Sequence, residues 1–173
     1  DNDVTHRDLT FEAVINSKLS VPRSNFLKDK LNLTDGTSTR INKRTVTEWL
    51  RYGSYMEDVN PFVRASHFHN PLRNWNVAAV RDLPWYMLTA SIAAGYSPRS
   101  NVFWATGYSS ATEKTLINNQ WSWDKAREYY YIYLTGKDFH GDTLATSREA
   151  RERNLSDSLR ALGQANLILF KEL

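Results

Sequence analysis

TSREARERNLSDSLRALGQANLILFKEL, residues 146–173, is the stretch of this sequence that decides its fold. Its first four residues match a capping box, in which a Thr or Ser side chain binds a backbone N–H and a Glu side chain reaches back. Mostly apolar side chains then recur at helical spacing along one side of the segment. They are Leu155, Leu159, Leu162, Asn166, Leu169 and Leu173. The pattern predicts a long helix, which we expect to be the central helix of the domain.

Helix signals also occur outside this stretch. Residues 121–134 place Trp and Tyr side chains at helical spacing. Residues 45–48 form a second capping box, and Gly53 then predicts the end of that helix, because glycine is common just past a helix C-terminus. Residues 5–8 form a third, with Thr5 as the cap. The buried stripe predicted to follow it consists of Leu9, Ala13, Ile15 and Leu19. Strand signals are weak throughout, so we predict an all-α fold in one domain, residues 1–173.

Composition narrows the classes of function. The chain contains no Cys, which excludes disulfides, thiolate zinc sites and cysteine nucleophiles. The formal net charge is +3 with scattered Lys and Arg, so charge alone does not indicate a nucleic-acid binder. No apolar run approaches the roughly 18 residues of a membrane-spanning helix. The sequence starts at Asp1 without Met or signal peptide, which indicates a processed or trimmed chain, and we expect a secreted or periplasmic protein.

Two segments contain residues that suit a metal ion. His6 lies near the free amine, at the first turn of a predicted helix. Glu57 and Asp58 are followed by His67 and His69, and a carboxylate and an imidazole in one region can share a zinc ion. In an extended backbone the two later His would point to opposite sides, so at most one of them would face a given metal. The alternative is that these polar groups are solvated or bound to the backbone.

These segments resemble the zinc-dependent phospholipase C and P1 nuclease superfamily, including its exported bacterial members. In phospholipase C an acidic residue after a glycine-containing turn is followed by His-Phe-Trp-Asp-Pro. Here residues 53–58 are GSYMED and residues 67–71 are HFHNP. A His entering the first helix is similar to P1-type nucleases. Residues 121–130 and the segment DSLRALGQ at 157–164 also fit.

The resemblance implies an all-helical domain with three zinc ions that cleaves phosphodiesters. One zinc is held by the N-terminal amine and carbonyl together with later side chains. Carried over by position, the candidate metal ligands are Asp1 through its backbone, His6, Asp58 and His67, and Glu57 competes with Asp58 for the carboxylate role. Paired zinc ions neutralise a phosphodiester and lower the pKa of bound water.

The chain departs from the family pattern on the predicted central helix. There the family places a His and, four residues later, an Asp, and the aligned positions here are Leu167 and Lys171. The chain stops at Leu173, so the family's later ligands have no counterpart. Because a catalytic zinc has about three protein ligands, the resemblance implies an incomplete zinc site in a domain truncated after its central helix.

Three functions follow from these observations. The one that the sequence favours is a non-catalytic exported module that assembles with itself or binds a partner. It would use the surplus of Trp and Tyr and the apolar C-terminal run at 167–170. The alternative is a zinc-dependent phosphodiesterase acting on phospholipid or nucleic acid through His6, Asp58 and His67. A basic nucleic-acid binder rests on the pI near 9.1 alone.

Overall fold

The computed structural model describes residues 2–16, 26–30, 32–59, 86, 89, 101–107 and 119–170. Its helices are α1 (Asn2–Ile15), α2 (Val46–Val59), α4 (Asn101–Thr106), α5 (Trp123–Thr135) and α6 (Arg148–Phe170). A π-helical turn η1 (Phe26–Lys30), a 3₁₀ turn η2 (Gly36–Ser38) and the antiparallel strands β1 (Arg40–Ile41) and β2 (Arg44–Thr45) lie between α1 and α2. The prediction of a mostly helical fold is therefore confirmed for the described part.

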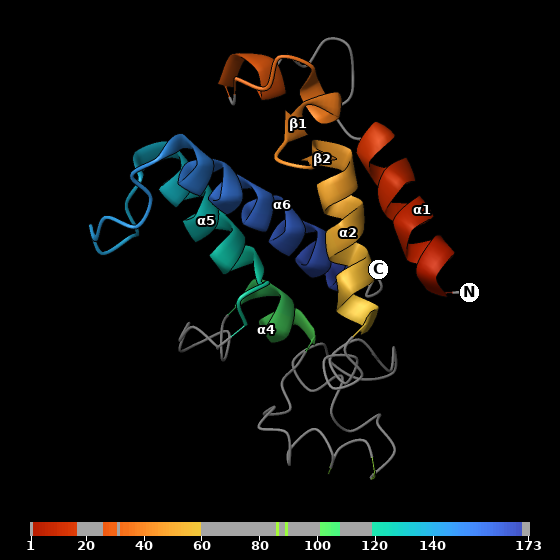
Figure 1. The fold of residues 1–173 in the computed structure, drawn as a ribbon. Coiled ribbons are helices and arrows are strands. Elements are labelled where there is room, and N and C mark those ends of the chain that lie inside the picture. Colours follow the sequence, from red (N-terminus) through yellow and green to blue (C-terminus); the bar gives the residue numbers. More distant parts are fainter. Residues whose placement is uncertain are drawn as a thin grey trace.

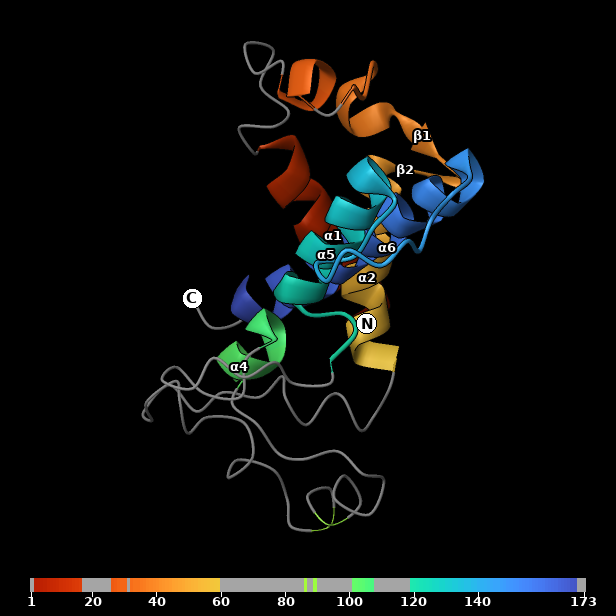
Figure 2. The ribbon, with the colours of Figure 1, turned by 90° about the vertical axis from the view of Figure 1, so that its left-hand side faces the viewer.

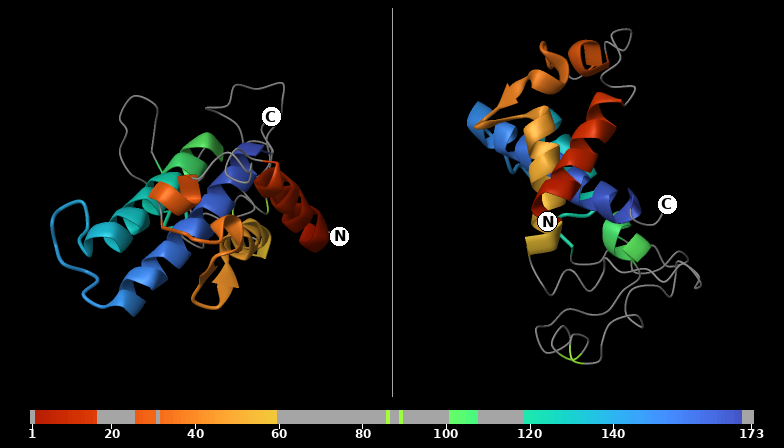
Figure 3. Two further views of the ribbon diagram at one scale, coloured as in Figure 1. Left: turned by 90° about the horizontal axis from the view of Figure 1, so that it is seen from above. Right: turned by 90° about the vertical axis from the view of Figure 1, so that its right-hand side faces the viewer.

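The longest helix, α6, is the central element, as the sequence predicts. Both α2 and α5 pack along α6, and α1 packs against α2 on the side away from α5 (Figure 1). The view from above shows the same order of these four helices (Figure 3). The short α4 packs near the C-terminal end of α6 (Figure 2). None of the described helices combines the length and hydropathy needed to cross a membrane.

Gly53 and Gly163 lie where α2 and α6 cross. A Cβ atom at Gly53 would overlap the backbone oxygen of Arg160, and one at Gly163 would overlap the backbone oxygen of Leu50. The two backbones therefore approach more closely than any residue with a side chain would allow. The prediction that Gly53 ends its helix is wrong, because α2 continues to Val59. The glycine is required by the neighbouring helix and not by a helix end.

The predicted helix caps have mixed outcomes. Thr45 and Glu48 form the predicted capping box: the Thr hydroxyl accepts from the Glu48 N–H at 3.2 Å, and the Glu carboxylate accepts from the Thr45 N–H at 2.7 Å. Hydrogen bonding lowers the pKa of the Glu48 carboxyl below its ordinary value. The bond from the Thr45 backbone N–H has the largest effect, and the bond with the Thr45 side chain comes next. At α6 the cap is Ser147, whose hydroxyl accepts from the N–H of Ala150 at 3.1 Å, so the predicted box is one residue too early. Thr5 is not a cap, because α1 already begins at Asn2.

The core lies between the β-hairpin, α2 and α6. Its buried side chains are Leu27, Leu33, Ile41, Val46 and Leu155. The predicted stripe on the first helix is wrong at Leu9, Ala13 and Ile15, which are exposed, whereas Val14 is buried; Leu19 lies outside the described residues. On α6 the stripe is confirmed at Leu155, and Leu159 packs against the core, but the stripe is wrong at Asn166, which is exposed. Leu162 is half-buried, the side chain of Leu169 and residue Leu173 lie outside the described part, and Ala161 and Ala165 are buried instead.

Substitution of Gly163 with Ala tests the close crossing of α2 and α6. In an ordinary helix interior this change stabilises by about 1 kcal/mol. Here we expect it to lower the free energy of unfolding by about 2 kcal/mol, because the added methyl group overlaps a backbone oxygen that cannot move independently. Urea unfolding followed by circular dichroism measures the change.

The matched control is Asn166→Ala on the exposed side of α6. It is expected to change the free energy of unfolding by less than about 0.5 kcal/mol. A Gly163→Ala variant as stable as this control would show that the two helices are not packed backbone against backbone.

Candidate metal centre

Two of the four predicted metal ligands lie on described helices. His6 lies in α1 and is partly buried, and Asp58 lies in the last turn of α2. Asp1 and His67 lie outside the described residues. Within the described ranges, no group of three or more His, Asp or Glu side chains could hold a metal ion. Of the candidate ligands, the structure therefore relates only His6 and Asp58 to each other, through the placement of α1 against α2.

The two helices pack in an antiparallel direction. The buried Ser54 hydroxyl lies 3.5 Å from the backbone oxygen of His6. Further along α1, Asp8 pairs with Arg51 of α2 at 3.2 Å. Because a helix rises about 1.5 Å per residue, Asp58 is about 6 Å beyond Ser54, in the direction of the first turn of α1. The register brings the N-terminal turn of α1 and the C-terminal turn of α2 to the same end of the helix pair.

Two cation–π contacts hold α1 in this register. The guanidinium of Arg7 lies 4.8 Å from the centre of the Tyr55 ring, and that of Arg51 lies 5.4 Å from the Phe11 ring. Each such contact at a partly exposed site contributes about 0.5–1 kcal/mol. Together with the buried Ser54, which also donates to a backbone oxygen of its own helix at 2.9 Å, they hold His6 in a defined place beside α2.

Glu57 is buried and hydrogen-bonded to two other helices, whereas a metal ligand needs a carboxylate oxygen that is free to bind the ion. Its side chain is 1% exposed. One carboxylate oxygen accepts from the indole N–H of Trp104 in α4 at 3.3 Å, and the other accepts from the amide of Gln164 in α6 at 2.5 Å. A buried carboxylate is tolerated only when hydrogen bonds or charges replace its water. Glu57 thus connects three helices, which favours Asp58 over Glu57 as the metal-binding carboxylate.

The C-terminal part of α6 runs along the same end of the molecule. Gln164 of α6 contacts Glu57 in the last turns of α2. Leu167 follows Gln164 by three residues in the same helix. A leucine supplies no donor atom to a metal. Lys171 lies outside the described residues.

Sequence reasoning missed Ser54, Trp104 and Gln164, the residues that organise this end of the bundle. A partial signal was present. Gly163 directly precedes Gln164, and Gly53 precedes Glu57 by one turn. A glycine inside a helix, away from any turn, indicates close contact with another backbone. That contact brings the following polar side chains of both helices together.

Comparisons with protein-family models, with curated proteins and with solved structures found no match to this chain.

Glu57→Gln tests the structural role of the buried carboxylate. The amide would place an N–H₂ group against one of the two donors that now bind the carboxylate. We expect the free energy of unfolding to fall by about 1–3 kcal/mol, as for other buried donors left without an acceptor. Thermal or urea unfolding measures it.

The control for this substitution is Glu12→Gln, which changes an exposed carboxylate on α1. Its expected effect is below about 0.5 kcal/mol. If both variants unfold alike, the hydrogen bonds of Glu57 do not connect the helices.

Proposed function

We propose that this chain is an exported helical module of the zinc phospholipase C and P1 nuclease type, which binds zinc without hydrolysing phosphodiesters. The zinc would lie where the N-terminal turn of α1 meets the C-terminal turn of α2. The observation that supports the proposal most directly is the antiparallel register of α1 and α2. It brings the helices that carry His6 and Asp58 together at one end, although the two residues are far apart in the sequence.

The donor set agrees with zinc in part. Imidazole nitrogen and carboxylate oxygen are ordinary zinc donors, at about 2.0–2.2 Å. The proposed ligands are the backbone of Asp1 with the side chains of His6, Asp58 and His67. Glu57 would act as a positioning residue, because its bonds to α4 and α6 hold the turn that carries Asp58.

The missing ligands argue against catalysis. The resemblance places a His where α6 has Leu167, so this helix offers no donor there. A catalytic zinc ion uses about three protein ligands and keeps one position open for water or substrate. In the family that the chain resembles, the remaining candidates belong to different zinc ions of a cluster. Gathered on one zinc, as proposed here, the four ligands would leave no open position for water or substrate. We therefore propose binding, and not turnover, as the function.

Zinc content tests this proposal. After dialysis against buffer without chelator, the purified protein should retain about one zinc ion per chain, a count set by the ligands available. His6→Ala, Asp58→Asn and His67→Ala should each lower the retained zinc by more than about half, because each removes one of few ligands. Mass spectrometry of the metals measures it.

His140→Ala is the matched control. His140 is exposed in the turn that follows α5, where its backbone N–H binds Asp138 at 2.9 Å. Its loss should leave the zinc content unchanged. An equal loss of zinc in all four variants, or no zinc in the parent protein, would contradict the proposed site. Hydrolysis of bis(p-nitrophenyl) phosphate that Asp58→Asn abolishes would instead establish a phosphodiesterase.

A separate observation favours self-association as a second function. Tyr131, Leu134, Phe139 and Leu144 are all exposed, and the rings of Tyr131 and Phe139 lie 5.2 Å apart. These four residues, the α5 patch, belong to α5 and the turn after it. Exposed aromatic and aliphatic side chains that lie together are typical of protein interfaces. The proposed partner is a second copy of this chain.

Light scattering after size-exclusion chromatography tests the α5 patch. Phe139→Ser should shift the protein toward the monomer, because it removes an aromatic ring from the patch. Leu9→Ser, which alters an exposed apolar side chain on α1, should leave the oligomeric state unchanged. A parent protein that is monomeric at all concentrations tested would contradict self-association.

A further inference from the structure

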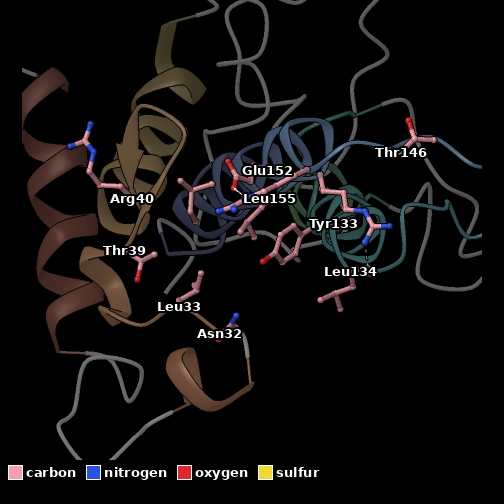
Figure 4. A pocket seen from close by; sticks show the side chains of 12 residues that line it. Asn32, Leu33, Thr39, Arg40, Tyr133, Leu134, Thr146, Glu152 and Leu155 are labelled. Atoms are coloured by element: carbon pink, nitrogen blue, oxygen red, sulfur yellow. Dashed lines mark hydrogen bonds and ion pairs between the residues drawn. The ribbon is translucent and has the colours of Figure 1, made fainter.

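A cavity of about 670 Å³ lies at the N-terminal end of α6 (Figure 4). Its lining comes from residues 32–41, from the C-terminal turn of α5 and from the first two turns of α6. Glu152 in this lining and Gln164 at the candidate metal centre are about 18 Å apart along α6, given the rise per residue of a helix. The cavity is therefore separate from the proposed zinc site.

One part of the lining is apolar. Leu33, Ile41 and Leu155 belong to the buried core and line the cavity from the segment before η2, from β1 and from α6. Tyr133 packs against this core, and Figure 4 shows its ring between Leu155 and Leu134. This surface could accept a small apolar or aromatic group, since burying such a group is favourable by about 25 cal/mol per Å².

The other part of the lining is positively charged. Arg40, Arg148 and Arg151 line the cavity together with one acidic residue, Glu152. Arg148 binds Glu152 at 2.8 Å, Arg151 donates to the backbone oxygen of Leu134 at 3.4 Å, and Arg40 donates to a backbone oxygen of the β-hairpin turn at 2.8 Å. Within the described part of the chain, these bonds use few of the five N–H donors that each guanidinium carries. The remaining donors are available to an anion.

The start of α6 adds to this positive charge. Ser147 caps the helix, and Arg148 and Arg151 lie in its first turn and just beyond it. The N-terminus of a long helix carries a partial positive charge. Planar guanidinium groups bind phosphate oxygens in pairs, which a lysine ammonium cannot do. The excess of arginine over glutamate matches the charge of a phosphate monoester, about −1.5 to −2 near neutral pH.

We infer that this cavity binds a small phosphate monoester with an apolar or aromatic substituent. Arg148 and Arg151 bind the phosphate, and Tyr133 and Leu155 contact the substituent. The inference does not depend on the proposed zinc site, since none of the candidate zinc ligands lines the cavity.

Calorimetric titration of the full chain with phenyl phosphate and with inorganic phosphate tests the inference. Phenyl phosphate should bind about ten times more tightly, because only its ring reaches the apolar lining. Inorganic phosphate that binds as tightly, or phenyl phosphate that does not bind at millimolar concentration, would overturn the inference.

Charge variants on α6 identify the site. Arg151→Gln should weaken the binding of phenyl phosphate about tenfold, the usual effect of losing a hydrogen bond to a charged group. Arg153→Gln is the matched control, because Arg153 is exposed on the same helix and does not line the cavity. Equal weakening in both variants would show general attraction to a basic surface and would overturn the inference.

Glu152→Gln is a second test variant, and it leaves all three arginines in place. It eliminates the acidic side chain of the cavity and releases Arg148 from its ion pair. Phenyl phosphate should then bind about threefold more tightly, since a like charge next to the phosphate weakens binding only modestly where solvent screens it. Unchanged or weaker binding would contradict the proposed position of the phosphate, even if Arg151→Gln proved unstable.

Discussion

The backbone oxygens of Leu50 and Arg160 occupy the space that side chains at Gly163 and Gly53 would need. At this crossing α2 and α6 approach until their main chains are in contact. Other features of the fold depend on it, because α6 also carries α5 along its length and α4 near its C-terminal end. The crossing brings the turn of α2 that contains Glu57 within hydrogen-bonding distance of Gln164. It thereby positions the last turn of α2, which carries the candidate ligand Asp58.

Two adjacent acidic residues have different tasks in this arrangement. Consecutive residues of a helix point about 100° apart, so Glu57 and Asp58 cannot share one environment. Glu57 is buried among Trp104 and Gln164, where its carboxylate holds α4 and α6 against α2. This assignment favours Asp58 for zinc, and it links the stability of the helix crossing to the geometry of the proposed site.

The proposals assign different chemistry to the two ends of α6. At the C-terminal end, imidazole and carboxylate groups suit a cation, although the leucine at position 167 supplies no donor. At the N-terminal end, arginines and the helix terminus suit an anion. The direction of the α6 dipole agrees with an anion at the cavity, because the positive end of this helix is there.

The sequence by itself determined the features that depend on neighbours within a few residues. The helical spacing in residues 121–134 and 146–173 identified α5 and the central α6, and the pair Thr45 and Glu48 identified the start of α2. The tertiary structure decided which faces are buried and what Gly53 is for. Both depend on contacts between residues about a hundred positions apart, and no local pattern encodes such contacts. The meeting of the helices that carry His6 and Asp58 was implied only by the resemblance, because it depends on the register of α1 on α2. The roles of Asp1 and His67 stay predictions.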